Sequence, residues 1–197
     1  MTKVSVIISS TREGRFGDQP ANWFHSRLAK RPNVTAKLLD LRDFPMPFFD
    51  QMMPPAAPGR PAYSNEVVQR WTAEIAEADA FVIITAEYNF GPPAVLKNAI
   101  DWVSAEWNRK PVGFVSYGSS AGVRSVQQLR EAAVELQMAP IRSAVHLPRG
   151  TIMAYFTGGD VPAALANSDG DAEKMIDDLL WWAAALTPAR RAAGLEA

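Results

Sequence analysis

Short apolar runs alternate along the chain with stretches whose apolar residues recur at helical spacing. Runs of four to eight apolar residues, rich in Val, Ile and Phe, are typical of buried strands. They predict five strands, at residues 4–8, 36–41, 81–85, 112–117 and 141–147. Helical spacing and end signals, such as Pro20 and a cap at Ser64 or Asn65, predict helices. These helices fall at residues 20–30, 65–78, 93–102, 123–137 and 171–186.

The order of these elements predicts the fold class. Strands that are apolar on both faces belong to parallel sheets covered by helices on both sides. The sequence therefore predicts an α/β fold: a flavodoxin-like, doubly wound, five-stranded parallel sheet with helices on both faces. We expect residues 1–148 to form this domain. Residues 149–197 would be a C-terminal extension, irregular over 149–170, with a helix packed on the same domain.

Composition and charge exclude several classes of protein. The chain has 197 residues, which favours one domain, and no cysteine, which excludes disulfides, thiolate metal sites and cysteine nucleophiles. A net charge of -1 provides no field to attract nucleic acid. No apolar stretch approaches the length of about 18 residues that spans a membrane. We therefore expect no nucleic-acid or membrane partner and a cytoplasmic location.

The first loop, residues 9–18 (SSTREGRFGD), follows a predicted strand and precedes a helix. Ligands of such sheets bind outside the carboxyl ends of the strands, where helix N-termini offer free N–H groups to anions. Hydroxyls and the guanidinium groups of Arg12 and Arg15 add donors that suit phosphate. The same composition also occurs in solvated turns, but this position favours a ligand. Neither a P-loop nor a dinucleotide motif is present, so a monophosphate fits best.

The second loop, residues 86–92 (AEYNFGP), combines aromatic rings with an amide and a rigid backbone. Aromatic faces stack on planar heterocycles, and amide groups hydrogen-bond to their edges. An equally good interpretation of this loop by itself is a turn in which Tyr88 and Phe90 cover the core.

Three segments together resemble a known family. Thr-Ala-Glu-Tyr-Asn at residues 85–89, followed by Pro-Pro-Ala-Val-Leu-Lys-Asn-Ala-Ile-Asp-Trp, is similar to the motif of the NADPH-dependent FMN reductase family. The first loop resembles that family's Gly-Ser-x-Arg phosphate loop, and the third loop, residues 118–122 (GSSAG), its Gly-rich loop at the flavin edge. The resemblance covers about residues 4–147. The chain departs from the family pattern at Ser9, Ala86 and Ser119.

The resemblance implies FMN as the cofactor, NADPH or NADH as co-substrate, and a small-molecule electron acceptor that reacts by ping-pong hydride transfer. No side chain is expected to be catalytic, because FMN carries the chemistry. The phosphate would be surrounded by Ser10, Arg12, Arg15, Phe16 and Gly17. The ribityl chain and ring would pack on Glu87, Tyr88, Asn89 and Phe90, and the pyrimidine edge on Tyr117, Gly118, Ser119 and Ser120. The resemblance also implies a homodimer or a dimer of dimers.

Two other functions compete with this interpretation. The third loop fits the G-x-S-x-G elbow of serine hydrolases, with Ser120 as nucleophile. However, the one histidine that follows is His146, and the acids between them, Glu131 and Glu135, lie within a predicted helix. A flavin-binding electron carrier or regulator without NADPH turnover is the stronger alternative, although carriers tend to be strongly acidic. His25 and His146 are isolated, so we expect no metal site.

Overall fold

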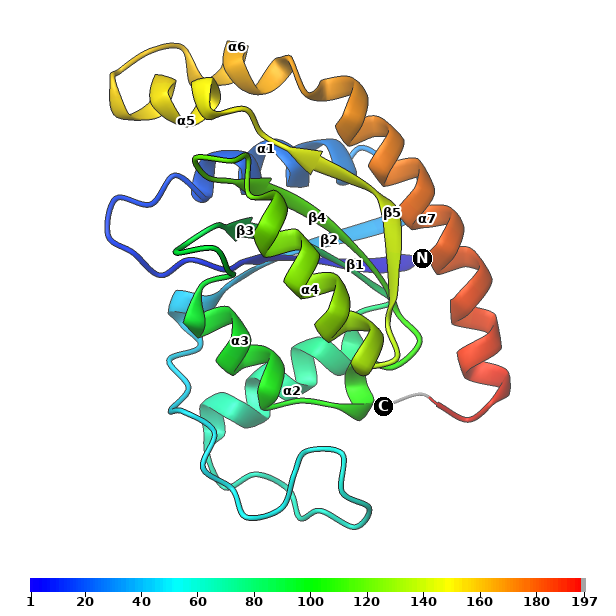
Figure 1. The fold of residues 1–197 in the computed structure, drawn as a ribbon. Coiled ribbons are helices and arrows are strands. Elements are labelled where there is room, and N and C mark those ends of the chain that lie inside the picture. Colours follow the sequence, from blue (N-terminus) through cyan, green and yellow to red (C-terminus); the bar gives the residue numbers. More distant parts are fainter. Residues whose placement is uncertain (196–197) are drawn as a thin grey trace.

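The computed structural model describes residues 1–195 and contains a five-stranded sheet with the order β2-β1-β3-β4-β5 (Figure 1). All four pairings in the sheet are parallel. The strands are β1 (Thr2–Ile8), β2 (Val34–Asp40), β3 (Ala80–Ala86), β4 (Pro111–Tyr117) and β5 (Ala139–His146). This order is that of the flavodoxin-like fold. The predicted fold class is confirmed, and each strand lies within two residues of its predicted bounds.

Helices cover both faces of the sheet (Figure 1). One hydrophobic cluster contains side chains of α1 (Asp18–Leu28) and α7 (Asp169–Ala192). A second cluster, on the other face, contains side chains of α2 (Glu66–Glu77), α3 (Ala94–Asp101) and α4 (Val123–Glu135). Two short 3-10 helices, η1 (Leu41–Asp43) and η2 (Ala105–Trp107), lie between these elements. As predicted, the side chain of Asn65 caps α2, accepting from the amides of Val67 and Val68.

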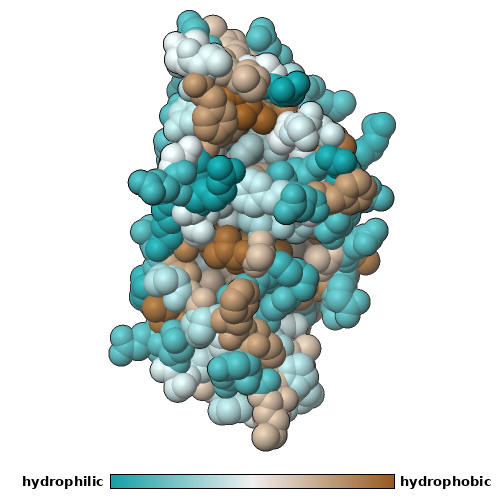
Figure 2. Space-filling model, turned by 60° about the vertical axis from the view of Figure 1, so that its left-hand side comes forward, coloured by the Kyte–Doolittle hydropathy of each residue, from teal (hydrophilic) through white to brown (hydrophobic). Residues whose placement is uncertain are grey.

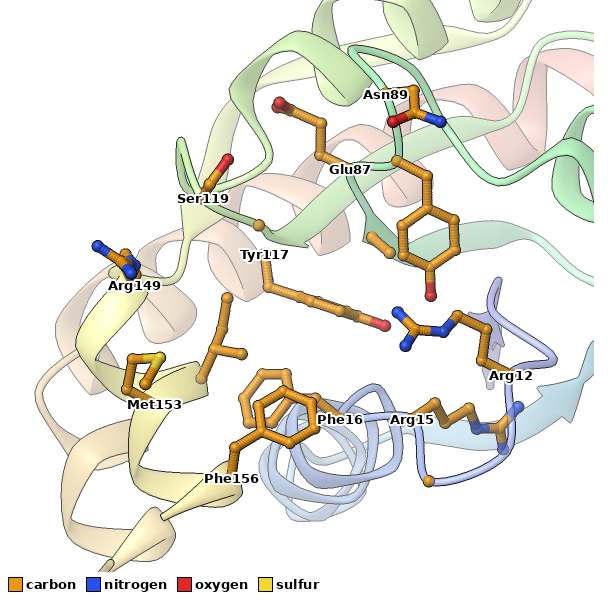
Figure 3. A pocket seen from close by; sticks show the side chains of 15 residues that line it. Arg12, Arg15, Phe16, Glu87, Asn89, Tyr117, Ser119, Arg149, Met153 and Phe156 are labelled. Atoms are coloured by element: carbon orange, nitrogen blue, oxygen red, sulfur yellow. The ribbon is translucent and has the colours of Figure 1, made fainter.

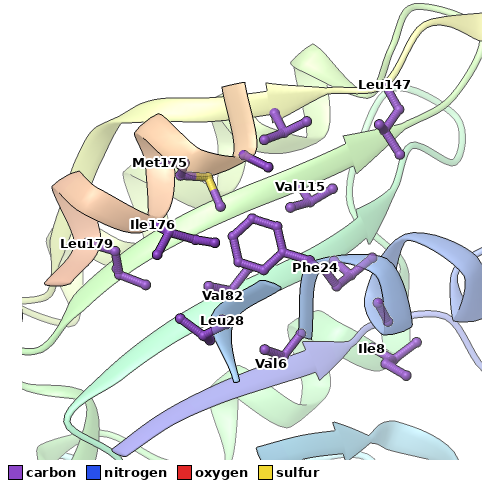
Figure 4. Close-up of a cluster of buried hydrophobic side chains, with 14 of the residues drawn as sticks. Val6, Ile8, Phe24, Leu28, Val82, Val115, Leu147, Met175, Ile176 and Leu179 are labelled. Atoms are coloured by element: carbon purple, nitrogen blue, oxygen red, sulfur yellow. The ribbon is translucent and has the colours of Figure 1, made fainter. Parts of the chain in front are cut away.

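The sheet centre is buried because β3 and β4 have no exposed residue along their length. Figure 4 shows Phe24 of α1 lying between the strands and the side chains of α7. The buried side chains of α7 recur at helical spacing, at Ala172, Met175, Ile176, Leu179 and Ala183. Arg27 of α1 and Arg31, just after this helix, form ion pairs with Asp169, Glu173 and Asp177 of α7. These buried contacts and ion pairs attach α7 to α1 and to one face of the sheet.

Most of residues 149–170 are helical, so the prediction of an irregular segment is wrong. They form α5 (Arg149–Phe156), α6 (Val161–Ala166) and the start of α7. The side chain of Asp160 caps α6 by accepting from the amide of Ala163, and Gly158, at φ 72°, separates the two short helices. α7 also runs past Pro188 to Ala192. A proline near a helix end removes only one backbone hydrogen bond, which the rest of a long helix tolerates.

The proline-rich segment before α2 has no regular structure, as predicted, but it is firmly attached to α3. The carbonyl of Pro47 accepts from Asn98 Nδ2 and Trp102 Nε1, each at 2.8 Å. Phe49 packs on Trp102, whereas Phe48 is 79% exposed. Among residues 1–195, no helix is both long and apolar enough to cross a membrane.

Candidate functional site

A cavity of about 720 Å³ opens at the carboxyl ends of β1, β3 and β4 (Figure 3). Loops after these three strands and one face of α5 form its walls. The cavity is lined by Arg12, Gly14, Arg15, Phe16, Ala86, Glu87, Tyr88, Asn89, Tyr117, Gly118, Ser119, Arg149, Ile152, Met153 and Phe156. β1 and β3 are neighbours where the strand order reverses, the place at which doubly wound sheets bind ligands.

The first loop offers free donors to this cavity. Within residues 1–195, the backbone N–H groups of Gly14 and Phe16 have no hydrogen-bond partner, and both residues line the cavity. The guanidinium of Arg12 lies 5.4 Å from the centre of the Tyr88 ring, and the side chain points into the cavity (Figure 3). Among the described residues no carboxylate pairs with Arg12. Unpaired donors and an unpaired cation make this end of the cavity an anion site.

Arg15 differs from Arg12, because its guanidinium points away from the cavity (Figure 3). It forms ion pairs with Asp18 and Asp40 and also donates to the carbonyl of Ser10. Burial alone would raise the pKa of Asp40, but hydrogen bonds from Arg15 and the amide of Arg42 outweigh burial and lower that pKa. The expected second guanidinium for a phosphate is therefore already neutralised, and Arg15 offers the cavity its backbone instead.

Further contacts fix the shape of the first loop. Ser10 Oγ lies 2.7 Å from Tyr88 Oη and accepts from the amide of Arg12 at 3.4 Å. From the other side, the guanidinium of Arg42 donates to the carbonyls of Thr11 and Arg12. The free amides are thus held in place before any ligand binds, which reduces the entropy lost on binding.

The second loop turns sharply between Tyr88 and Gly91. The two residues exchange backbone hydrogen bonds at 2.9 and 3.1 Å, and both residues between them have positive φ, 48° at Asn89 and 77° at Phe90. A bulky residue is strained in this region, and such strain often marks a functional loop. The turn directs Tyr88 and Asn89 to the cavity, while Phe90 is 60% exposed and lies under the guanidinium of Arg124.

An ion pair joins the second and third loops. Glu87, whose side chain is 2% exposed, accepts from Arg124 Nε at 2.6 Å and from the backbone amide of Arg124 at 3.2 Å. The third loop must pass close to this pair: a Cβ on Gly118 would lie 2.9 Å from the Cβ of Glu87. Gly122 has φ 75°, and a Cβ there would lie 2.7 Å from the backbone of Tyr117. These glycines allow the tight turn from β4 into α4.

The geometry of the third loop excludes the hydrolase elbow. Ser120 Oγ accepts from Arg124 at 3.1 Å, whereas His146 Nδ1 lies 2.7 Å from Ser116 Oγ. The histidine thus supports a different serine, whose hydroxyl also donates to the carbonyl of Ala121 at 2.8 Å. Burial, with help from the charge of Arg130, lowers the pKa of His146. A neutral His146 therefore holds the start of the third loop.

Tyr117 forms a wall of the cavity between the first and third loops. Its ring meets Phe16 edge to face, with centroids 5.1 Å apart. Its buried hydroxyl has no hydrogen-bond partner within residues 1–195, and a Cβ on Gly17 would lie 2.8 Å from it. Burial and the neighbouring Tyr88 raise the pKa of Tyr117, so the group is a neutral donor. A buried hydroxyl without a partner next to a cavity indicates a place for a ligand.

The structure brings most of the expected site residues together, although four do not line the cavity: Ser10, Gly17, Phe90 and Ser120. Sequence reasoning missed two groups. One is Arg124, whose ion pair becomes visible only in three dimensions. The other is Gly14, Ala86 and the α5 residues Arg149, Ile152, Met153 and Phe156. The spacing of those four α5 residues at i, i+3, i+4 and i+7 was the available signal for a helix with one common face.

Comparisons with known proteins agree with this geometry. The family model described as NADPH-dependent FMN reductase matches residues 2–151. An NAD(P)H-dependent FMN reductase of Schizosaccharomyces pombe is 37% identical over 155 residues, covering 77% of this chain and 76% of that protein. A 2-hydroxy-1,4-benzoquinone reductase of a Burkholderia species is 33% identical over 118 residues, covering 56% of this chain and 55% of that protein.

A solved structure supports the fold. FerB of Paracoccus denitrificans, a flavoenzyme described as an NAD(P)H:(acceptor) oxidoreductase, superposes with a TM-score of 0.62 at 21% identity. The superposition covers 91% of this chain and 97% of FerB. The agreement therefore extends past the end of the family model at residue 151, into the helices that follow β5.

Proposed function

Since this chain belongs to the NADPH-dependent FMN reductase family, we propose that its cavity binds FMN with the phosphate in the first loop. The protein is an NAD(P)H-dependent reductase of flavins and quinones. The single observation that carries the binding proposal is the free anion site at one end of the cavity. There, the unpaired guanidinium of Arg12 and the free amides of Gly14 and Phe16 lie beside flat aromatic walls.

The residues present fit FMN on chemical grounds. One phosphate needs several donors and one or two positive charges, which the first loop supplies. A planar ring needs flat walls and a few polar groups, which Tyr88, Asn89 and Tyr117 supply along the cavity. The buried Tyr117 hydroxyl without a partner is a donor for a ligand oxygen. No dinucleotide motif accompanies the loop, which favours FMN over FAD.

In this proposal each loop has its own task. The first loop binds the phosphate through Arg12 and backbone amides, with Ser10, Arg15, Phe16 and Gly17 holding its shape. Glu87, Tyr88, Asn89 and Phe90 form the second loop beside the ribityl chain and ring. Tyr117, Gly118, Ser119 and Ser120 lie at the pyrimidine edge, where Arg124 fixes the second and third loops relative to each other. FMN held by these three loops would supply the redox chemistry between NAD(P)H and the acceptor, while the residues named above would bind and orient it.

We propose that donor and acceptor use the same side of the cavity in turn, which gives ping-pong kinetics. The test is to add FMN to the purified protein, then NADPH without oxygen, and to record the visible absorption spectrum. We expect bound FMN, bleaching by NADPH, and parallel double-reciprocal lines with a quinone as second substrate. Intersecting lines would contradict alternating binding. Bound FMN that neither NADPH nor NADH bleaches would show an electron carrier instead.

Two further properties are proposals as well. We propose that the protein forms a homodimer, supported by the exposed Phe48, Met52 and Met53 of the proline-rich segment. A dimer of dimers would need a second such surface, for which the exposed Trp181 and Trp182 of α7 are the available aromatic pair. A cytoplasmic location stays a prediction, consistent with the use of NAD(P)H and testable by cell fractionation.

A further inference from the structure

Helix α5 presents one mixed face to the cavity. Four residues of this helix, spaced at i, i+3, i+4 and i+7, line the cavity: Arg149, Ile152, Met153 and Phe156 (Figure 3). We refer to these four residues as the α5 face. Met153 is 42% exposed and Phe156 is 60% exposed. In the space-filling view, apolar surface gathers in the upper part of the molecule, where α5 lies, with hydrophilic side chains around it (Figure 2). Exposed apolar side chains beside a cavity indicate a binding surface.

Arg149 adds a free positive charge to this face. Within residues 1–195, the side chain of Arg149 has no hydrogen bond or ion pair. Its place in the first turn of α5 brings the helix no benefit, because that end of a helix favours acidic side chains. The other arginines around the cavity differ: Arg15 and Arg124 are paired with carboxylates, and Arg12 belongs to the first loop. The α5 face thus combines an unused cation with apolar surface.

We propose that the α5 face binds the co-substrate, selecting a molecule that carries both an aromatic ring and an anionic group. This inference rests on the proposed function, in which Arg12 and the first loop already bind the FMN phosphate. Arg149 then contacts the anion of the second molecule, while Met153 and Phe156 contact its ring. The family model ends at residue 151, so Ile152, Met153 and Phe156 lie beyond the family match.

The anion can come from two sources, either a phosphate of NADPH or an acidic substituent on a quinone acceptor. One experiment separates them with two variants, Arg149→Ala and the control Arg142→Ala, an exposed arginine of β5 that does not line the cavity. The first arm compares KM for NADPH and NADH with 1,4-benzoquinone as acceptor. The second arm compares KM for a carboxylated benzoquinone and 1,4-benzoquinone, with NADH as donor. Calorimetry gives the Kd of NADP⁺ and NAD⁺ for the FMN-loaded protein, a measure independent of turnover.

Loss of a charge-assisted contact to an exposed guanidinium is expected to weaken binding about tenfold. If Arg149 binds a phosphate of the donor, Arg149→Ala should raise the KM for NADPH and the Kd of NADP⁺. If it binds the acceptor, Arg149→Ala should instead raise the KM for the carboxylated quinone. A loss in either arm supports the proposal and identifies the source. Unchanged values in both arms, equal to those of Arg142→Ala, would overturn it. Wild-type protein without any turnover would instead overturn the proposed function.

The apolar part of the α5 face has its own test. Phe156→Ala should raise KM for both quinones by about three- to tenfold, regardless of their charge, because ring contact is lost without loss of the cation. The side chain is largely exposed, so the variant should keep the wild-type melting temperature and FMN affinity. An unchanged KM for both quinones in a fully folded Phe156→Ala protein would show that the ring does not bind there.

Discussion

Arg12 and Arg15 lie three positions apart in one loop, yet only Arg12 keeps its charge free. Two carboxylates surround the guanidinium of Arg15, so its charge contributes to the fold rather than to a ligand. Arg12 lies beside the ring of Tyr88, and no carboxylate among the described residues pairs with it. Its positive charge can therefore attract an anionic ligand in the cavity. The same residue type thus stabilises the loop at one position and attracts an anion at the other.

The first prediction concerns Arg12. Arg12→Ala should weaken FMN binding by about 1.5–3 kcal/mol, the value of a charge-assisted hydrogen bond, and leave riboflavin binding unchanged. Flavin fluorescence titrations measure both affinities, and the exposed Arg142→Ala is the control. Equal affinities of the wild-type protein for riboflavin and FMN would contradict a phosphate site in the first loop.

Asp40 provides a prediction on pH. The pKa of Asp40 is lowered in the folded protein, so between the folded and unfolded pKa values the folded state binds fewer protons than the unfolded state. The free energy of unfolding therefore rises with pH between these two pKa values. The contribution is complete above the unfolded pKa of about 4 and is lost as pH falls through the lower folded pKa. At pH 6, Asp40→Asn should cost about 2 kcal/mol, less than a fully buried pair.

Urea unfolding between pH 2.5 and pH 6 checks this prediction. The difference between wild type and Asp40→Asn should shrink steadily towards low pH, while Asp43→Asn, an exposed neighbour, should follow the wild type. A difference that stays constant across this range would show that Arg15 does not hold the charged form of Asp40.

At the scale of elements, the strands and the loops after them could be predicted, because buried parallel strands leave a clear apolar signal. The first loop, between β1 and α1, could also be recognised from the sequence, because its Arg, Ser and Thr residues are typical of phosphate-binding loops. The pairing of Arg15 could not be predicted, because Asp40 lies at the end of β2 and comes close only through sheet register. α5 was missed because Gly150 and Thr151 weaken its helical signal and an exposed, site-facing helix lacks a continuous buried stripe.

The end of α7 is attached to the sheet by an ion pair between Arg190 and Asp79. Arg190, 7% exposed, donates to Asp79 Oδ1 at 3.0 Å, and the amide of Lys3 donates to Asp79 Oδ2 at 2.9 Å. These contacts attach the helix to the starts of β1 and β3, at the opposite end of the sheet from the cavity. Arg190→Met removes the positively charged partner of the buried Asp79 carboxylate. The free energy of unfolding should therefore fall by about 3 kcal/mol.

Urea unfolding and FMN titration together measure this effect. Lys174→Met, at an exposed position on the same helix, is the control and should stay within about 0.5 kcal/mol of the wild type. FMN affinity of folded Arg190→Met should equal that of the wild type. A selective loss of FMN affinity, without loss of stability, would show that α7 acts on the site rather than on the fold.

At the scale of the whole molecule, the exposed side chains of the proline-rich segment lie on a different surface from the cavity. The cavity occupies the carboxyl edge of the sheet, whereas the proline-rich segment and α3 form another surface, with a hollow of about 660 Å³ lined by Phe48 and Lys97, among others. Lys97 and Asp101 pair across one turn of α3 at 2.8 Å, so this surface carries both signs of charge. A surface with both charges and an apolar centre can match a copy of itself across a two-fold axis.

The homodimer proposal therefore predicts that Phe48 lies in the contact between two chains. Light scattering should give twice the chain mass of 21.6 kDa for the wild type, and Phe48→Glu should shift the protein to the monomer because a carboxylate would be buried in the interface. Trp181→Glu is the matched control, since Trp181 is an aromatic residue of α7 with 66% exposure. A dimer that survives Phe48→Glu but dissociates in Trp181→Glu would place the interface on α7, and a monomeric wild type would contradict the homodimer.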